Sequence, residues 1–338
     1  MNCITFDPPV HHADLRITID FNSFEVRSGN LFGGIKYLSH GIHLISFGFA
    51  DSEDAARYGY WFEIGPEYEY YCIEFDQQSG LFKLVSVFDR AKFEEKSRKI
   101  HPFMVSYPQI EDLDSSWSSF TNYIHKDQIR GILNNNSGYM DSSMTSLEEI
   151  KWLRTKLNQQ PSNDEPFFNY TVIKFKSSDA IRDDHKMEDF LDKSYYLNNK
   201  IIKRDYQGHL NRLFGELQFS FLSVLLFGNY GSSLQWHNLI ELICFSSEVD
   251  ANTIKRIDQC VSLQLKRLSD EHSILLNEDM WKRCFASSFH CNDLPRIKEA
   301  IEPFFLEIAD KSNDGDDHDD EDDEYKPTVA GGVYYQRV

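Results

Sequence analysis

The hydrophobic pattern of this chain changes its period about halfway along, and this change limits the possible folds more than any other feature. Up to about residue 145, apolar and polar residues alternate, as at Leu15, Ile17 and Ile19, which is the period of a half-buried strand. From about 187 to 309, apolar residues recur every three or four positions, which is the period of helices that face a core. The 338-residue chain is therefore predicted to be an α+β protein with two domains.

The first domain, 1–155, is expected to be an antiparallel, β-sandwich-like domain. Turn-forming stretches such as Asp76–Gly80 separate its strand candidates, and a spacing of roughly 10–13 residues favours a sandwich or barrel over βαβ units. Two helices are predicted, over 89–99 and 116–132. The predicted strands are Leu15–Ile19, Ile42–Phe49, Tyr58–Ile64, Glu69–Phe75 and Leu81–Phe88.

The second domain, 170–309, is expected to be an all-α, superhelix-like stack of helices. The polar stretch 156–169 is interpreted as an exposed linker between the two domains. Gly228–Gly231 should end the first long helix, and Ser232 or Ser233 should cap the next one. The predicted helices run from Leu210 to Leu225, through Trp236 to Ile243, from Ile254 to Leu268, from Asn277 to Phe289 and from Asp293 to Ala309.

The charge of the chain is concentrated near its C-terminus. The formal net charge is −19, and the segment 310–324 contributes ten acidic residues and one lysine to it. Such a block cannot form a core, so 310–324 is expected to be a disordered acidic tether. An acidic chain repels phosphate backbones, so we expect no direct binding of nucleic acid.

The tail 325–338, beyond the acidic block, is β-prone and aromatic. A strand on a flexible tether typically works by adding to an open sheet edge of a partner. Tyrosines suit such an interface because they bring a large contact area at a low entropic cost. The alternative is a tail that folds back on its own domain. The residues expected to bind the partner are Thr328, Val329, Val333, Tyr334, Tyr335 and Arg337.

No targeting, membrane or redox signal stands out. The sequence has no run of about 18 apolar residues, so no membrane association is expected. The first residues lack the basic and apolar regions of a signal peptide. The six cysteines form no C-x-x-C pair, and we interpret them as free thiols in a reducing compartment.

Few residues indicate chemistry, and no cofactor, metal site or catalytic residue is predicted. Cys284, His290, Cys291 and Asp293 have no second ligand pair, so Cys284 is interpreted as a buried core residue. His40 and His43 are interpreted as structural. Gly228–Ser233 precedes a helix but lacks the lysine and the spacing of a phosphate loop.

Two serines follow the predicted Trp236 helix and are candidates for phosphorylation. Ser247 has an acidic residue, Asp250, three positions on, as in sites of acid-directed kinases, and Ser246 precedes it. A phosphate at the C-terminal end of a helix is disfavoured by the helix dipole and would disturb local packing. The alternative is that both serines only cap a loop between helices.

A set of short segments spread over both predicted domains and the tail is distinctive. The segments are Ile19–Val26, Phe32–Lys36, Gly41–His43, Met104–Pro108, Asp192–Leu197, Gly215–Phe219, Gln235–His237 and Pro327–Arg337. They resemble the signature sequences of the AAR-two family, the A-one cistron splicing factors, which are assembly factors of the U5 small nuclear ribonucleoprotein.

This resemblance implies a β-sandwich-like N-terminal domain, an all-α C-terminal domain and no enzymatic activity. It implies binding to the spliceosomal protein Prp-eight, at its RNase H-like and Jab/MPN domains, in an intermediate of U5 assembly that excludes the Brr-two helicase. The tail would act as a strand shared between those two domains. Phosphorylation of Ser246 or Ser247 would release the complex. Cytoplasmic assembly followed by nuclear maturation implies both locations.

Two other functions stay open at this point. A hydrolase or nucleotide-binding enzyme would use the loop Gly228–Ser233 and should bind nucleotide saturably. A generic acidic chaperone should bind basic proteins at large, with a steep dependence on salt and no need for Tyr334 and Tyr335.

Overall fold

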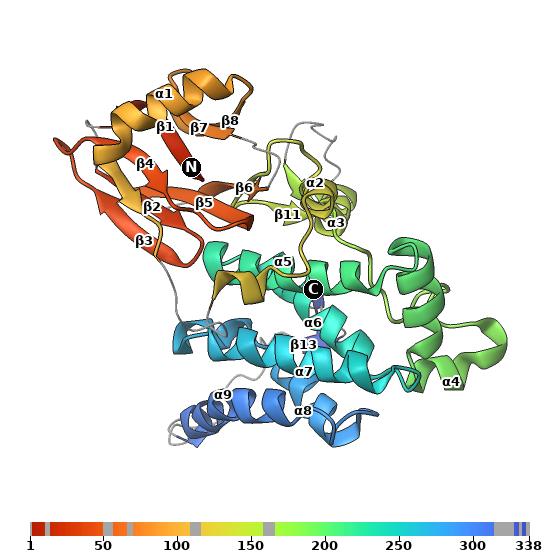
Figure 1. The fold of residues 1–338 in the computed structure, drawn as a ribbon. Coiled ribbons are helices and arrows are strands. Elements are labelled where there is room, and N and C mark those ends of the chain that lie inside the picture. The colour runs from red at the N-terminus through yellow and green to blue at the C-terminus, as the bar shows by residue number, and fades with distance from the viewer. Residues whose placement is uncertain are drawn as a thin grey trace. The chain divides into compact units, whose positions relative to one another are not determined.

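The computed structural model describes residues 2–10, 14–49, 57–65, 70–108, 116–157, 166–313, 328–330 and 333–335. Its contacts group residues 1–300 into one compact unit and 301–338 into a second. Within the first unit the N-terminal part is built of strands and the remainder mainly of helices (Figure 1). The predicted fold class is confirmed, whereas the domain bounds 1–155 and 170–309 stay a prediction.

Two five-stranded sheets form the N-terminal part of the first unit. Every strand that the sequence predicted is present, to within one residue at each end. The first sheet has the order β8 (Leu81–Val87), β7 (Tyr70–Asp76), β1 (Cys3–Val10), β4 (Phe32–Lys36) and β9 (Met104–Ser106). The second has the order β10 (Tyr139–Asp141), β6 (Tyr58–Ile64), β5 (Gly41–Phe49), β2 (Leu15–Ile19) and β3 (Asn22–Val26).

The first sheet is mixed, so the expectation of an antiparallel domain was wrong for this layer. β1 runs parallel to β7, and β4 runs parallel to β9. Strands so distant in sequence pair only once the whole sheet has assembled, and parallel pairs need long connections. For that reason the local pattern predicted neither β1, β4 nor β9.

A glycine lets β4 pack closely against β1. Gly34 has a φ of +137°, and a Cβ atom there would collide with the carbonyl oxygen of Ile4. Any other residue would have to push the two strands apart. This contact explains the glycine at position 34, whereas a Cβ atom at Gly33 would lie 3.2 Å from Ile100 at the end of α1.

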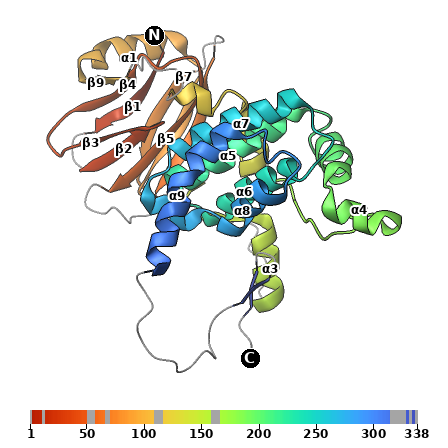
Figure 2. The same cartoon turned by 90° about the horizontal axis from the view of Figure 1, so that it is seen from below.

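Aromatic side chains fill the space between the two sheets. The ring centroids of Phe6 and Phe32 lie 4.9 Å apart, and those of Phe47 and Phe82 lie 5.2 Å apart. The opposite face of the first sheet packs against the helix α1 (Arg90–Ile100), where Phe93 lies 4.6 Å from Tyr70 (Figure 2). Both faces of this sheet are thus buried.

The predicted helix over 116–132 is interrupted. A 3₁₀ turn, Trp117–Phe120, is separated from α2 (Lys126–Leu133) by five residues in other conformations. Between them the backbone N–H of Tyr123 donates to Gln218 Oε1, at 3.0 Å, and not to a carbonyl one turn back. A distant side chain therefore takes the hydrogen bond that a continuous helix would have used.

The helical part contains all the helices predicted there, with two corrections at their ends. Asn229, and not Ser232 or Ser233, caps α6, because its Oδ1 accepts from the N–H of Ser232 at 2.8 Å. The last helix includes residues 310–313, the start of the expected acidic tether, whereas 314–327 lie outside the described residues. The helices are α3 (Leu147–Leu157), α4 (Lys186–Leu191), α5 (Leu210–Phe227), α6 (Tyr230–Cys244), α7 (Ala251–Lys266), α8 (Glu278–Ser287) and α9 (Pro295–Asn313), with a π-helix at Tyr196–Asp205. Further 3₁₀ turns lie at His101–Phe103, Asp183–His185 and Asp270–Leu275.

Across the part of the chain that the structure describes, no helix combines the length and the apolar composition that crossing a membrane requires.

The predicted linker 156–169 is not exposed at its C-terminal end. β12 (Phe167–Phe168) pairs in parallel with β11 (Thr145–Ser146), and Phe168 is fully buried. The polar residues of this stretch, 158–165, lie outside the described residues. Phe168 is buried because α5 offers it an apolar surface at Phe219, whereas Phe167 is half-buried.

The α5 segment Gly215–Phe219 joins the sheets to the helices. A Cβ atom at Gly215 would collide with the side chain of Gln128, so the glycine allows α2 to approach. Glu216 accepts from Thr171 N at 2.8 Å. Phe219 lies with its ring centroid 5.2 Å from that of Trp61 on β6. One turn and a half of helix therefore holds three segments that are remote in sequence.

The pKa values of two buried histidines, His43 and His237, are shifted in opposite directions. His43 places Nδ1 2.7 Å from Asp20 Oδ2 and Nε2 3.0 Å from the Ser39 carbonyl oxygen. Burial alone would lower its pKa, but the Asp20 carboxylate and the two hydrogen bonds outweigh burial, and the pKa of His43 is raised. His237 donates from Nδ1 to the Ser233 carbonyl at 2.8 Å and accepts at Nε2 from Trp281 Nε1 at 3.3 Å. It is therefore neutral, and burial lowers its pKa to about 4.

The setting of His237 predicts a loss of stability in acid. Its folded pKa of about 4 lies below the ordinary value of 6.5, so below pH 6.5 the unfolded state binds the proton more readily and stability falls as the pH falls. The expected loss from this group is about 3 kcal/mol between pH 6.5 and pH 4. Urea unfolding at a series of pH values checks this result. His237→Gln should flatten the slope in that range, and parallel curves for the two proteins would contradict the prediction.

Candidate functional site

The loop between α6 and α7 contains both predicted phosphorylation candidates, Ser246 and Ser247. The two serines differ in their exposure to solvent. Ser246 is 0% exposed. Its Oγ donates to the Leu242 carbonyl at 2.6 Å, and its own carbonyl accepts from His290 Nε2 at 2.8 Å. Ser247 is exposed. Of the two candidates, only Ser247 offers its hydroxyl to a modifying enzyme in this conformation.

Asp192 receives the Ser247 side chain. The Ser247 hydroxyl donates to Asp192 Oδ2, and the Ser247 N–H donates to Asp192 Oδ1 at 3.1 Å. Ser194 donates to Asp192 Oδ1 from its backbone N–H, at 2.9 Å, and from its hydroxyl, at 2.5 Å. Ser194 Oγ in turn accepts from the Glu248 N–H at 2.9 Å. A single carboxylate thus fastens the α6–α7 loop to the segment that follows α4.

The network keeps Asp192 ionised. Partial burial alone would raise its pKa, but the hydrogen bonds from Ser194 and Ser247 outweigh burial and lower the pKa of Asp192. Hydrogen bonds to the charged form favour that form. A second negative group on Ser247 would therefore face a fixed negative charge.

Backbone contacts reinforce this attachment. The Lys193 N–H donates to the Phe245 carbonyl at 2.7 Å, and Asn198 Nδ2 donates to the Glu248 carbonyl at 3.3 Å. Lys193 Nζ donates to the Asp189 carbonyl at 3.0 Å and to the Phe190 carbonyl. A lysine ammonium at the last carbonyls of α4 stabilises that end of the helix. The α6–α7 loop, α4 and the π-helix therefore form one connected site.

Asp192 and Ser194 belong to this site, although no sequence pattern predicted a role for them. Both lie in the segment Asp192–Leu197. This segment is one of those that resemble the family's signature sequences, but the resemblance assigned no role to either residue. The local signal was an aspartate two residues before a serine, a pair that commonly bonds to its own backbone in turns. The partner loop is 55 positions away, so no local pattern could have linked the two.

The C-terminal tail contains two strands. β13 (Thr328–Ala330) pairs antiparallel with β14 (Val333–Tyr335), with Val329 opposite Tyr334. The tail is therefore a short hairpin and not the single continuous strand expected from the sequence. Arg337 lies outside the described residues. Binding of a partner by Thr328, Val329, Val333, Tyr334 and Tyr335 stays a prediction.

The loop Gly228–Ser233 connects α5 to α6 and is hydrogen-bonded to other parts of the protein. Asn229 Nδ2 donates to the Met144 carbonyl at 2.6 Å, and Ser233 Oγ donates to the Leu275 carbonyl at 2.8 Å. Tyr170 and Ser232 share a hydrogen bond of 2.7 Å between their hydroxyls. Asn229, Ser232 and Ser233 are all buried. The N-terminus of α6 thus bonds its Ser232 and Ser233 N–H groups to Asn229, and a phosphate would have to compete for them.

The candidate metal ligands around Cys284 do not assemble. Within the described ranges, the one close group of three such side chains is Asp7, Cys72 and Glu74. Lys96 Nζ already occupies this group, 2.5 Å from Asp7 Oδ2 and 3.7 Å from Cys72 Sγ. Cys284 is fully buried and lies in the core, as predicted. The Lys96 ammonium group takes the place that a metal ion would occupy, so this cluster is a salt bridge.

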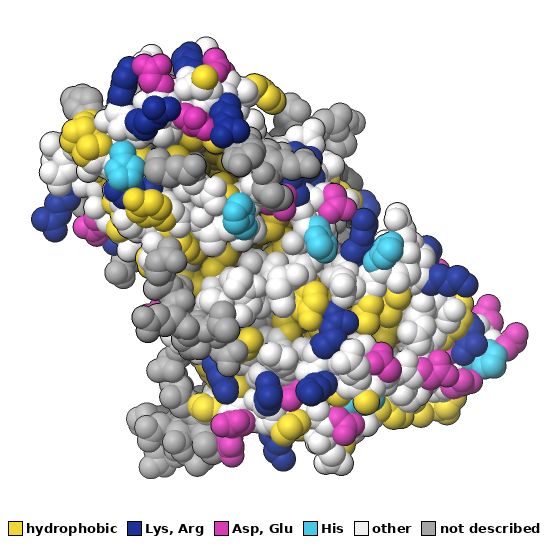
Figure 3. Space-filling view, in the orientation of Figure 1, with side chains coloured by type: hydrophobic (Ala, Val, Ile, Leu, Met, Phe, Trp, Pro, Cys, Tyr) yellow, Lys and Arg dark blue, Asp and Glu magenta, His cyan; other side chains and the backbone are white. Residues whose placement is uncertain are grey.

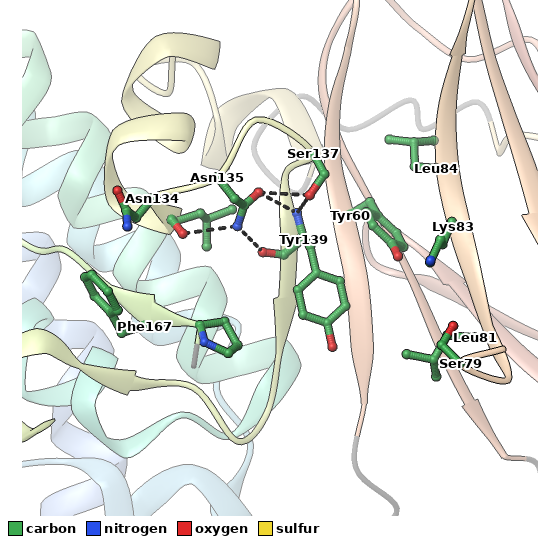
Figure 4. Close-up of a pocket in the computed structure, with 12 residues that line it drawn as sticks. Tyr60, Ser79, Leu81, Lys83, Leu84, Asn134, Asn135, Ser137, Tyr139 and Phe167 are labelled. Carbon is green, nitrogen blue, oxygen red and sulfur yellow. Dashed lines mark hydrogen bonds between the residues drawn. The ribbon is translucent and has the colours of Figure 1, made fainter. Parts of the chain in front are cut away.

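A pocket of about 560 Å³ lies where the edge strands β8 and β10 approach each other (Figure 4). Asn135 is held there by its own neighbours, since Nδ2 donates to the Tyr139 carbonyl at 3.0 Å and Oδ1 accepts from Ser137 Oγ at 3.0 Å. Lys83 is paired with Asp76 at 2.5 Å. Among the described residues that line it, none is a His, Cys, Asp or Glu, the side chains that most often act as general bases or metal ligands. The lining residues are Tyr60, Ser79, Leu81, Lys83, Leu84, Leu133, Asn134, Asn135, Ser137, Tyr139, Pro166 and Phe167.

Comparisons with known proteins cover nearly the whole chain. Residues 10–134 match the family model described as the AAR2 N-terminal domain, and residues 170–325 match the AAR2 C-terminal repeat region. The A1 cistron-splicing factor AAR2 of Saccharomyces cerevisiae is 42% identical over 362 residues. That alignment covers 100% of both chains.

Proposed function

Because the chain belongs to the AAR2 family, we propose that it acts in pre-mRNA splicing, as a non-catalytic assembly factor of the U5 small nuclear ribonucleoprotein. The observation that carries this proposal is the 42% identity, along both entire chains, to a protein named as a splicing factor.

The proposed partner is Prp-eight, bound at its RNase H-like and Jab/MPN domains. Binding there excludes the Brr-two helicase until the complex matures. Assembly takes place in the cytoplasm and release in the nucleus. The net charge of −19 supports a protein partner over RNA, because a protein this acidic repels phosphate.

The tail is proposed to bridge the two partner domains by strand addition. β13 and β14 pair through three residue pairs only, and an isolated two-stranded hairpin is marginally stable in water. Exchanging that pairing for the edge of a partner sheet therefore costs little free energy. The backbone then supplies affinity, and the tyrosines at 334 and 335 supply specificity.

Release is proposed to follow phosphorylation of Ser247. A phosphate adds up to two negative charges where the Ser247 hydroxyl now donates to the Asp192 carboxylate. The phosphate cannot donate that hydrogen bond, and it repels the carboxylate. The loop then detaches from the segment after α4.

Two features of the structure bear on the alternative that the chain is an enzyme. The helix N-terminus at Gly228–Ser233 is closed by its own hydrogen bonds, which disfavours the nucleotide-binding alternative. The pocket beside β8 is lined by neutral side chains and one paired lysine.

A pull-down tests the proposed function. The RNase H-like and Jab/MPN domains of the partner are presented separately and together, and the full-length chain is compared with a chain that ends at Glu324. We expect only the full-length chain to bridge both domains. The shortened chain should remain folded, because the tail has no core of its own; a thermal melt checks this.

Each result of the pull-down has a distinct meaning. Equal bridging by both proteins would assign recognition to the folded part and overturn the strand mechanism. No binding by either would overturn the assembly function itself. Equal binding of unrelated basic proteins, lost in high salt and unaffected by Tyr334→Ala and Tyr335→Ala, would favour the generic acidic chaperone.

A further inference from the structure

Helix α4 exposes the most concentrated group of large hydrophobic side chains in the described part of the chain. Met187 is 76% exposed, Phe190 55% and Leu191 60%. Their spacing of three and four residues places them on one face of the helix. Other strongly exposed hydrophobic residues, such as Phe88 and Ile274, are far apart in the sequence. Single exposed residues are ordinary, whereas a contiguous apolar face marks an interaction surface.

The α4 face is held in place by polar contacts beneath it. Arg182 donates to the buried Asp189 carboxylate from Nε, at 2.9 Å, and from Nη2, at 2.7 Å. The Arg182 N–H donates to the same carboxylate at 2.8 Å. Six residues are too few for a helix to persist in water by itself. The fold therefore fixes a helix whose outer face is apolar, which no requirement of its own core explains.

The rim of this face is acidic. Asp183, Asp184 and Glu188 are exposed, and the single lysine among them, Lys186, leaves a local charge of −2. Asp189 and Arg182 cancel each other. In Figure 3, yellow hydrophobic and magenta acidic side chains adjoin at the end of the molecule where Figure 1 labels α4. An apolar face with a negative rim complements an amphipathic segment that carries Lys or Arg.

We infer that the α4 face is a docking surface for a basic, amphipathic segment of the protein partner. This inference rests on the proposed function, since it takes the bridged partner as the occupant. An anionic membrane and a nucleic acid are alternative ligands for an exposed helix. Both would be repelled by the carboxylates of Asp183, Asp184 and Glu188.

The docking surface is connected to Ser247. Asp192 directly follows α4, and its N–H donates to the Glu188 carbonyl at 2.8 Å. The carboxylate of the same residue holds the Ser247 hydroxyl. A phosphate on Ser247 therefore acts on the residue that ends α4. Release then comes from displacement of the docking helix, and the phosphate needs no contact with the partner.

The test uses the full-length chain and the partner domains of the pull-down, with affinity measured by titration calorimetry. Met187→Ser, Phe190→Ser and Leu191→Ser are combined in one variant. We expect binding at least tenfold weaker, because central apolar anchors dominate interface energies. A matched control combines Phe88→Ser and Ile274→Ser, which are 97% and 85% exposed in the native chain, and it should bind like the native protein.

A second variant tests the charge complementarity. Asp183→Asn, Asp184→Asn and Glu188→Gln together should weaken binding and flatten its dependence on salt. Native affinity in the apolar variant, or an equal loss in the matched control, would overturn the inference. Binding of the native chain to phosphatidylserine vesicles, lost in the apolar variant, would overturn it in favour of a membrane. Failure of the native chain to bind the partner domains would instead overturn the proposed function.

Discussion

Replacing Phe219 with Ala is expected to lower the free energy of unfolding by about 3–5 kcal/mol, as truncation of buried phenylalanines does. Phe219 is fully buried in the middle of α5. Its ring contacts Trp61 on β6, at a centroid distance of 5.2 Å, and also Phe168 and Tyr170, at 6.2 Å and 6.3 Å. The substitution thus opens a cavity where the sheets, the strand β12 and the helices meet.

The control for this prediction is Phe88→Ala. Phe88 is almost fully exposed, so its truncation should change stability by less than about 0.5 kcal/mol. Urea unfolding followed by far-ultraviolet circular dichroism and by tryptophan fluorescence measures both variants. For Phe219→Ala the two probes should also separate, because the sheets and the helices lose their shared core. A stability change no larger than that of Phe88→Ala would show that this junction contributes nothing.

Ser247→Glu is expected to weaken binding of the full-length chain to the proposed partner domains at least tenfold, as phosphorylation would. The introduced carboxylate lies against Asp192, whose pKa is lowered by its hydrogen bonds from Ser194 and Ser247 despite partial burial. Like charges at hydrogen-bonding distance repel, and the loop loses a donor. The residues that follow α4 are then released from the loop.

Two matched variants separate charge from the loss of a contact. Ser247→Ala removes the hydroxyl without adding charge and should bind nearly as tightly as the native chain. Asp192→Asn combined with Ser247→Glu removes the repulsion and should recover part of the lost affinity, measured by calorimetry. If Ser247→Ala weakened binding as much as Ser247→Glu, or if Asp192→Asn rescued nothing, the electrostatic explanation would be wrong.

Phosphorylation at Ser246 is expected to require local unfolding. Its hydroxyl is buried against the Leu242 carbonyl, whereas Ser247 is exposed and bonds to Asp192. The sequence favoured Ser247 only through Asp250, three positions on, and left both serines as candidates. Burial decides between them, and burial depends on how the α6–α7 loop sits beside His290 and Asp192.

The local sequence pattern was sufficient to predict a strand or helix wherever the segment makes its backbone hydrogen bonds locally and buries one face. The strands from Leu15 to Ile19 and from Tyr58 to Ile64 were predicted to the residue, and each of them pairs with β5, which is close to it in sequence. The helix α5 was predicted for a similar reason, since the backbone hydrogen bonds of a helix join residues only four positions apart. The family resemblance also came from the sequence, and the comparisons confirmed it.

Tertiary contacts decided everything that joins remote segments. The parallel pairing of β1 with β7, the break before α2 and the burial of Phe168 all depend on partners that are tens of residues away. The same is true of the Asp192–Ser247 contact, which links residues 55 positions apart. Sequence by itself thus determined five strands of the two sheets, the long helices of the C-terminal part, the fold class and the family of this protein. Only the tertiary structure decided which serine is accessible and which helix presents an apolar face, because exposure is a property of the assembled chain.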